Sequence, residues 1–186
     1  MWSIIFWNHA ETTAKQLAQH LLGGSAISMA ITAEIGNRTL LHAIETASRE
    51  GDMDEMGDHL RHFCTGYEKL LGYRNFYVHA LFATRPSKTT ENEMEGMLLS
   101  IDGKGKLRAF NQPVTAANFA LFTKHTQKLI GYGVAIQKQL GATGDGLEAM
   151  INNYSASLEK PQWPSQIEKT AHYLQGQESH FQGLPL

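Results

Sequence analysis

The chain has 186 residues, of which 42% are hydrophobic and 18% charged, an ordinary globular composition that excludes disorder of the whole chain. Sixteen Lys and Arg residues against eighteen Asp and Glu residues give a net charge of -2. This balance argues against a protein that coats nucleic acid or anionic membrane. The single cysteine, Cys64, excludes an intrachain disulfide and a CxxC metal site. No apolar run approaches the roughly 18 residues of a membrane span, so we expect a cytoplasmic protein without membrane contact.

The first fifty residues carry helical patterns separated by glycine breaks. Apolar residues at three-and-four spacing predict a helix over residues 2–22, which the glycine pair at 23–24 ends. Ser25 is the expected N-cap of a second helix. A Gly-Asn break at 36–37 follows, and residues 38–49 continue helically.

The longest helical pattern extends from Asp54 to Thr84 and contains no proline. We expect it to be the core helix around which the fold is organised. Its predicted apolar stripe comprises Met56, Leu60, Phe63, Tyr67, Leu70, Val78 and Leu81. Arg74 falls on this stripe, where a charge is costly unless a partner pairs with it.

The second half of the chain changes character. Residues 86–95 are polar and predict a loop, and two alternating runs around a glycine-rich turn predict a β-hairpin at about 97–110. A long helix is expected from about residue 113 to residue 140, with Thr115 as its N-cap. Shorter helices are expected over 147–158 and 166–174.

Helices joined by short breaks pack against one another in antiparallel pairs. The sequence therefore predicts an all-α fold, an up-and-down helical bundle with one small β-hairpin insertion. We expect residues 1–140 to form the bundle. Residues 141–186 would be a C-terminal helical appendage and tail packed on the same domain.

Polar residues in the central helix form a candidate site. At about 100° per residue, Glu68, Asn75 and His79 fall along one edge of the helix, and Arg74 lies about 100° from Asn75. A histidine can exchange a proton at neutral pH, and an arginine can brace a phosphate through two hydrogen bonds. Asn75 can orient either group. This set suits metal-free cleavage of RNA, in which the 2′-hydroxyl is the nucleophile, and no cofactor is expected.

The run Arg74-Asn75-Phe76-Tyr77-Val78-His79 resembles the Arg-x4–6-His motif of the HEPN superfamily, the higher eukaryote and prokaryote nucleotide-binding domains. Members similar to this chain are small α-helical homodimers. Many are metal-independent endoribonucleases of toxin–antitoxin or phage-defence systems, with a composite site at the dimer interface. The resemblance implies an RNA substrate and an antitoxin partner.

The resemblance also implies roles for individual residues. Arg74 would bind the scissile phosphate and His79 would be the acid–base group. Asn75 would complete the catalytic set, with Glu68, Tyr73 and Tyr77 in support. HEPN toxins that are silenced by a nucleotidyltransferase resemble Arg-x4-His-x-Tyr, whereas this chain has leucine at the last position, residue 81.

Two other interpretations stay open. In the first, the protein is a non-catalytic dimeric interaction module, and Arg74 is a structural arginine paired with Glu68 or Glu11. In the second, it is a helical-bundle metalloprotein. His59 and His62 are three residues apart on one helix face, a spacing that can chelate zinc, nickel or iron.

Overall fold

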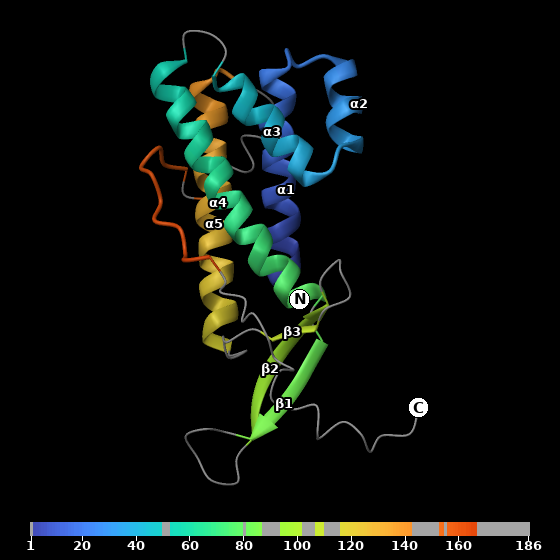
Figure 1. The fold of residues 1–186 in the computed structure, drawn as a ribbon. Coiled ribbons are helices and arrows are strands. Elements are labelled where there is room, and N and C mark those ends of the chain that lie inside the picture. Colours follow the sequence, from blue (N-terminus) through green and yellow to red (C-terminus); the bar gives the residue numbers. More distant parts are fainter. Residues whose placement is uncertain are drawn as a thin grey trace. The chain divides into compact units, whose positions relative to one another are not determined.

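The computed structural model describes residues 2–49, 53–79, 81–86, 94–101, 107–109, 116–142, 153–154 and 156–166. Over these ranges the chain forms five helices and three strands (Figure 1). The chain divides into two compact units, one of Met1–Leu70 with Leu121–Pro164 and one of Leu71–Ala120 with Ser165–Leu186. The first unit is a helical bundle, as predicted. Among the described helices, none has both the length and the apolarity needed to cross a membrane.

The first three helices agree with the local signals in the sequence. They are α1 (Trp2–Leu21), α2 (Ala26–Glu34) and α3 (Asn37–Ala47). Two glycines with positive φ, 89° at Gly23 and 66° at Gly24, end α1 in the left-handed region that side chains disfavour. Ser25 caps α2, because its hydroxyl oxygen accepts a hydrogen bond of 3.1 Å from the N–H of Ser28. The predicted glycine stop and serine cap are therefore both confirmed.

The central helix, α4 (Asp54–His79), is shorter than predicted. The expected extension to Thr84 is wrong, because residues 81–86 form a strand. The run from Leu81 to Thr84 is short and apolar, so its periodicity fits a strand as well as a helix. Pairing with a distant strand decides between them, which local sequence cannot show.

The strands form one antiparallel sheet in the order β1-β2-β3. They are β1 (Leu81–Pro86), β2 (Met94–Ile101) and β3 (Leu107–Ala109), with Leu81 opposite Leu99 and Leu99 opposite Ala109. The prediction of an isolated hairpin insertion over 97–110 therefore does not describe this segment. The sheet has one strand more than the predicted hairpin, namely β1, which follows α4. Strand β2 begins inside the predicted polar loop. The glycine-rich turn at 102–105 lies outside the described residues.

The last long helix, α5 (Ala116–Gln139), agrees with the predicted pattern, although its expected cap at residue 115 lies outside the described residues. The helix expected over 147–158 is wrong at its end, because residues 156–158 are not helical. Residues 156–164, which we call the strap, form an irregular segment held by contacts to α4. Pro161 and Pro164 remove backbone donors that a helix would need. Of the helix expected over 166–174, only residue 166 is described, and it is not helical.

The core of the first unit joins α1, α3, α4 and α5. Trp7 packs on Tyr67 with ring centres 5.1 Å apart, and the Tyr67 hydroxyl donates a 2.8 Å hydrogen bond to Oδ1 of Asn37. A Cβ added at Gly133 would lie 2.6 Å from the Thr13 methyl group, so α5 approaches α1 more closely than a side chain allows. Fully buried apolar residues fill this core, among them Leu17, Leu40, Ile44, Leu60, Phe63, Leu70, Leu129, Ile130 and Ile136.

Candidate functional site

All the residues of the predicted site belong to α4, which continues without a break to His79. The helical phase that places Asn75 and His79 on one edge is therefore present in the backbone. Glu68 is exposed and belongs to the first unit, whereas residues 71–79 belong to the second. His79 is the last residue of the helix, and its side chain lies outside the described part of the chain.

Arg74 and Asn75 form a polar pair near the surface. Nη1 of Arg74 donates a 3.1 Å hydrogen bond to Oδ1 of Asn75. Asn75 is exposed and Arg74 is half-buried. The predicted stripe through Val78 is wrong in this part of α4: Phe76 is buried, whereas Val78 is 46% exposed. The buried face changes because α4 passes from one unit into the other after Leu70, where different neighbours cover it.

The two tyrosines near this pair are engaged in packing. Tyr77 lies 4.4 Å from Phe119 between ring centres and 6.4 Å from Tyr73. The Tyr73 hydroxyl donates a 2.9 Å hydrogen bond to the carbonyl oxygen of Ser165. Burial raises the pKa of Tyr77 to about 12, with a smaller contribution from Tyr73. Tyr77 is therefore neutral at physiological pH and does not exchange protons there.

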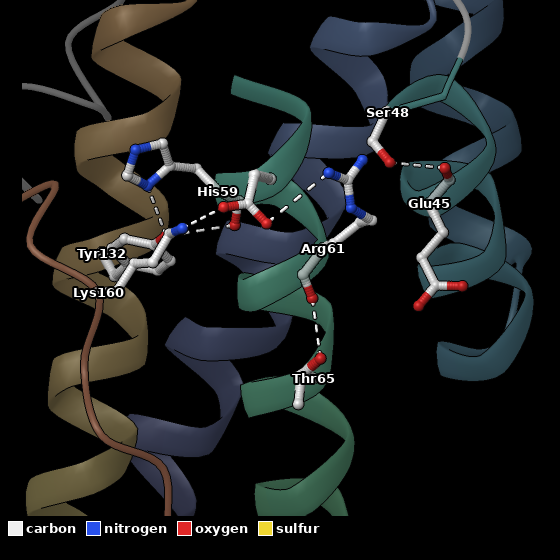
Figure 2. A network of polar contacts seen from close by, with 8 residues as sticks. Glu45, Ser48, His59, Arg61, Thr65, Tyr132 and Lys160 are labelled. Carbon is white, nitrogen blue, oxygen red and sulfur yellow. Dashed lines mark hydrogen bonds and ion pairs between the residues drawn. The ribbon is translucent and has the colours of Figure 1, made fainter. Parts of the chain in front are cut away.

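The histidines of the metal hypothesis are used for hydrogen bonding. Nδ1 of His59 lies 2.7 Å from the Tyr132 hydroxyl on α5 (Figure 2). Nε2 of His62 donates a 2.9 Å hydrogen bond to the carbonyl oxygen of Pro161 in the strap. Over the described residues, no group of three His, Cys, Asp or Glu side chains is placed to hold a metal ion. The structure therefore brings no third ligand to this pair there.

Sequence reasoning did not foresee the attachment of the strap to α4. The indole Nε1 of Trp163 donates a 3.0 Å hydrogen bond to the His62 carbonyl oxygen, and the two rings stack with centres 5.3 Å apart. Gly66 makes this approach possible, because a Cβ there would overlap the indole ring. The one signal in the sequence was the proline pair at 161 and 164, which favours extended backbone but names no partner.

An exposed ion-pair cluster also joins the strap to α4 (Figure 2). Asp58 pairs with Lys160 of the strap and lies 3.7 Å from the Arg61 guanidinium. Hydrogen bonding and charge attraction from Lys160 hold the pKa of Asp58 below its usual value, and Arg61 contributes less. Because these groups face water, the pairs contribute little to stability.

A cavity of about 400 Å³ lies between the strap and α5. Its lining comprises Lys128, Tyr132, Ser157, Glu159, Lys160, Pro161 and Gln162. Burial raises the pKa of Tyr132, so its phenol stays protonated. Lys160 is already paired with Asp58. Among the described residues, the lining thus contains one further lysine and one glutamate but no activated nucleophile.

Comparison with known proteins gives no relative of this chain. No protein-family model matches it, and neither does any curated protein or solved structure. What the chain does is therefore inferred from its own residues.

Proposed function

We propose that the chain is a HEPN-like, metal-independent endoribonuclease of the toxin or phage-defence type, which acts as a homodimer with a composite site. The observation that carries this proposal is the Arg74–Asn75 pair near the surface of the same helix that ends at His79. Leucine at position 81 means that an antitoxin partner would silence it by a route other than modification of a tyrosine there.

The geometry of α4 supports these roles. Residues 75 and 79 are one helical turn apart, about 6 Å along the axis, so a ligand the size of a phosphodiester can contact both. A guanidinium presents its N–H donors in a planar fork that matches two phosphate oxygens, which suits Arg74 to this role. Asn75 thus orients the charge, and Arg74 supplies it.

The chemistry requires two proton transfers and one stabilised anion. One His79 imidazole takes the proton from the 2′-hydroxyl as its oxygen attacks the phosphorus. The bond to the 5′-oxygen then breaks, and the protonated His79 of the second protomer gives that oxygen its proton. Arg74 stabilises the negative charge on the phosphoryl oxygens. The products are a 2′,3′-cyclic phosphate and a 5′-hydroxyl end.

The test is cleavage of a mixed-sequence RNA by the purified protein in EDTA. His79→Ala should lower the rate by about 10²–10⁴-fold, the usual contribution of a general acid–base group. Arg74→Ala should have a comparable effect. Thr65→Ala, an exposed change on the same helix outside the predicted site, should cut at the wild-type rate. Undiminished cleavage by His79→Ala, or cleavage only with added metal, would refute the proposal.

A second candidate is a non-catalytic interaction module. The observation that favours it is the exposed apolar surface of α2, where Ile27 is 73% and Met29 is 54% exposed. Under this candidate, the wild-type protein does not turn over RNA at any concentration. Arg74→Ala would then alter stability without altering any activity.

A further inference from the structure

Helix α2 buries polar residues and exposes apolar ones, the reverse of the usual pattern for a surface helix of a monomer. Its buried residues are Ser28 and Thr32, which are 4% and 3% exposed. Its large apolar residues face outward, with Ile27 73%, Met29 54% and Ile31 49% exposed. A surface helix ordinarily buries its apolar stripe and exposes its polar residues.

The polar groups on the buried face of α2 have hydrogen-bond partners. The Ser28 hydroxyl donates a 2.7 Å hydrogen bond to the Ser25 carbonyl oxygen, and the Thr32 hydroxyl donates one of 2.8 Å to the Ser28 carbonyl oxygen. The two buried hydroxyls are therefore satisfied within α2 and require nothing from α1, on which α2 packs. The unusual feature of α2 is therefore the exposure of its apolar residues on the outward face.

The outward face has small residues along its centre. At about 100° per residue, Ala26, Ala30 and Ala33 lie within about 60° of one another, opposite Ser28 and Thr32. All three alanines are exposed. The isoleucines at 27 and 31 flank this strip on one side, and the methionine at 29 flanks it on the other. Small residues at the centre let a second backbone approach, and the flanking side chains enclose it.

We propose that this face binds the same face of a second copy of the chain, with the two α2 helices antiparallel across a two-fold axis near Ala30. The position of the charged residue of α2 favours this antiparallel pairing. The only charged residue of α2 is Glu34 at its C-terminal end, and a parallel pair would place two glutamates together. An antiparallel pair places Glu34 beside the partner's α2 N-terminus, the positive end of its dipole.

The size and composition of the face also favour a second copy. Across a two-fold axis both protomers bury the same face, so the apolar surface removed from water is twice that of one α2. A nine-residue helix without lysine or arginine lacks the basic face of helices that lie on lipid. It likewise offers no cation to a nucleic acid or an acidic partner.

This inference does not rest on the proposed ribonuclease site. Helix α2 belongs to the first unit, whereas Arg74 and His79 belong to the second. The two contacts therefore involve different parts of the chain. RNA cleavage and the α2 contact can therefore fail separately.

The first test measures the molar mass of the full chain by light scattering across a range of concentrations. Ile27→Lys should weaken association by about 100-fold or more, because each dimer would bury two unpaired ammonium groups. Leu121→Lys, at a residue 52% exposed on α5, is the matched control and should leave the mass unchanged. A monomeric wild type, or an unchanged mass for Ile27→Lys, would overturn the proposal.

The second test fixes the orientation and does not depend on a disruptive variant. Ala30→Cys lies near the proposed axis, so two copies should form an intermolecular disulfide under mild oxidation. Ala26→Cys should not, because in an antiparallel pair it faces residue 34 rather than itself. The native Cys64 is fully buried and does not compete. Failure of Ala30→Cys to cross-link, or faster cross-linking of Ala26→Cys, would overturn the antiparallel contact.

Discussion

The substitution Gly66→Ala tests how the strap is attached to the helical bundle. Gly66 lies on α4 directly beneath the Trp163 ring, and a methyl group there would overlap the indole. The strap must then move away from α4, and the contacts that Trp163 makes with His62 are lost or weakened. We expect the variant to be less stable than the wild type, even though alanine is a better helix former than glycine.

The magnitude follows from the contacts at stake. The indole hydrogen bond contributes about 1 kcal/mol. Ring stacking adds about 1 kcal/mol. Partial burial of Trp163, which is half-buried, adds about 1–2 kcal/mol. The gain in helix propensity offsets about 1 kcal/mol. The net loss is about 2–3 kcal/mol, which for a chain of this size lowers the melting temperature by about 4–12 °C.

The assay is urea unfolding followed by circular dichroism, with tryptophan fluorescence as a second probe of the strap. Gly72→Ala is the matched control on the same helix, because no atom lies within 4 Å of an added Cβ there. This control should raise stability by about 0.5–1 kcal/mol. The two changes are chemically identical and should differ in sign.

A double-mutant cycle supplies the refutation. In a Trp163→Ala background the overlap is absent, so Gly66→Ala should become stabilising by about 1 kcal/mol. If Gly66→Ala is harmless in the wild type, the strap does not pack on α4 as described. If it is equally destabilising without the indole, the cause lies elsewhere in the helix.

Three further predictions concern single side chains. Ser25→Ala should cost about 1 kcal/mol in urea unfolding through loss of the α2 cap, whereas Ser25→Asp should retain most of the stability. Cys64 is buried, and its pKa is raised to about 12, mainly by burial, so a thiol reagent should label it only after unfolding; labelling of native protein would contradict its placement. Burial and then the nearby lysines of α5 lower the pKa of His125, so the unfolded state binds its proton more readily. Stability should therefore fall as the pH drops below about 6.5, and His125→Gln should reduce this slope in thermal melts; an unchanged slope would exclude His125 as its source.

Much of the helical part of the fold was predictable because its boundaries are local. The glycine pair at 23–24 and the serine cap at 25 act through backbone geometry and hydrogen bonds within a few residues. The register of Leu60, Phe63, Tyr67 and Leu70 follows from a period of 3.6 residues and is confirmed as the buried face of α4.

The candidate site was predictable only as a sequence of residues on one helix. Arg74, Asn75 and His79 share α4 as expected, because helical spacing alone puts them there. The hydrogen bond between Arg74 and Asn75 and the packing of Tyr77 on Phe119 depend on rotamers and on neighbours from another helix. No local pattern specifies those.

The sequence by itself determined where most helices of this protein begin and end, since caps, glycines and periodicity act over a single turn. Tertiary structure decided the rest. Pairing between Leu81 and Leu99 turned the end of a predicted helix into a strand. Contact with Gly66 placed the strap, and packing on α1 left the isoleucines of α2 facing outward. Each of these outcomes depends on which distant surface covers a segment, and that is set by the free energy of the whole assembled core rather than by the segment.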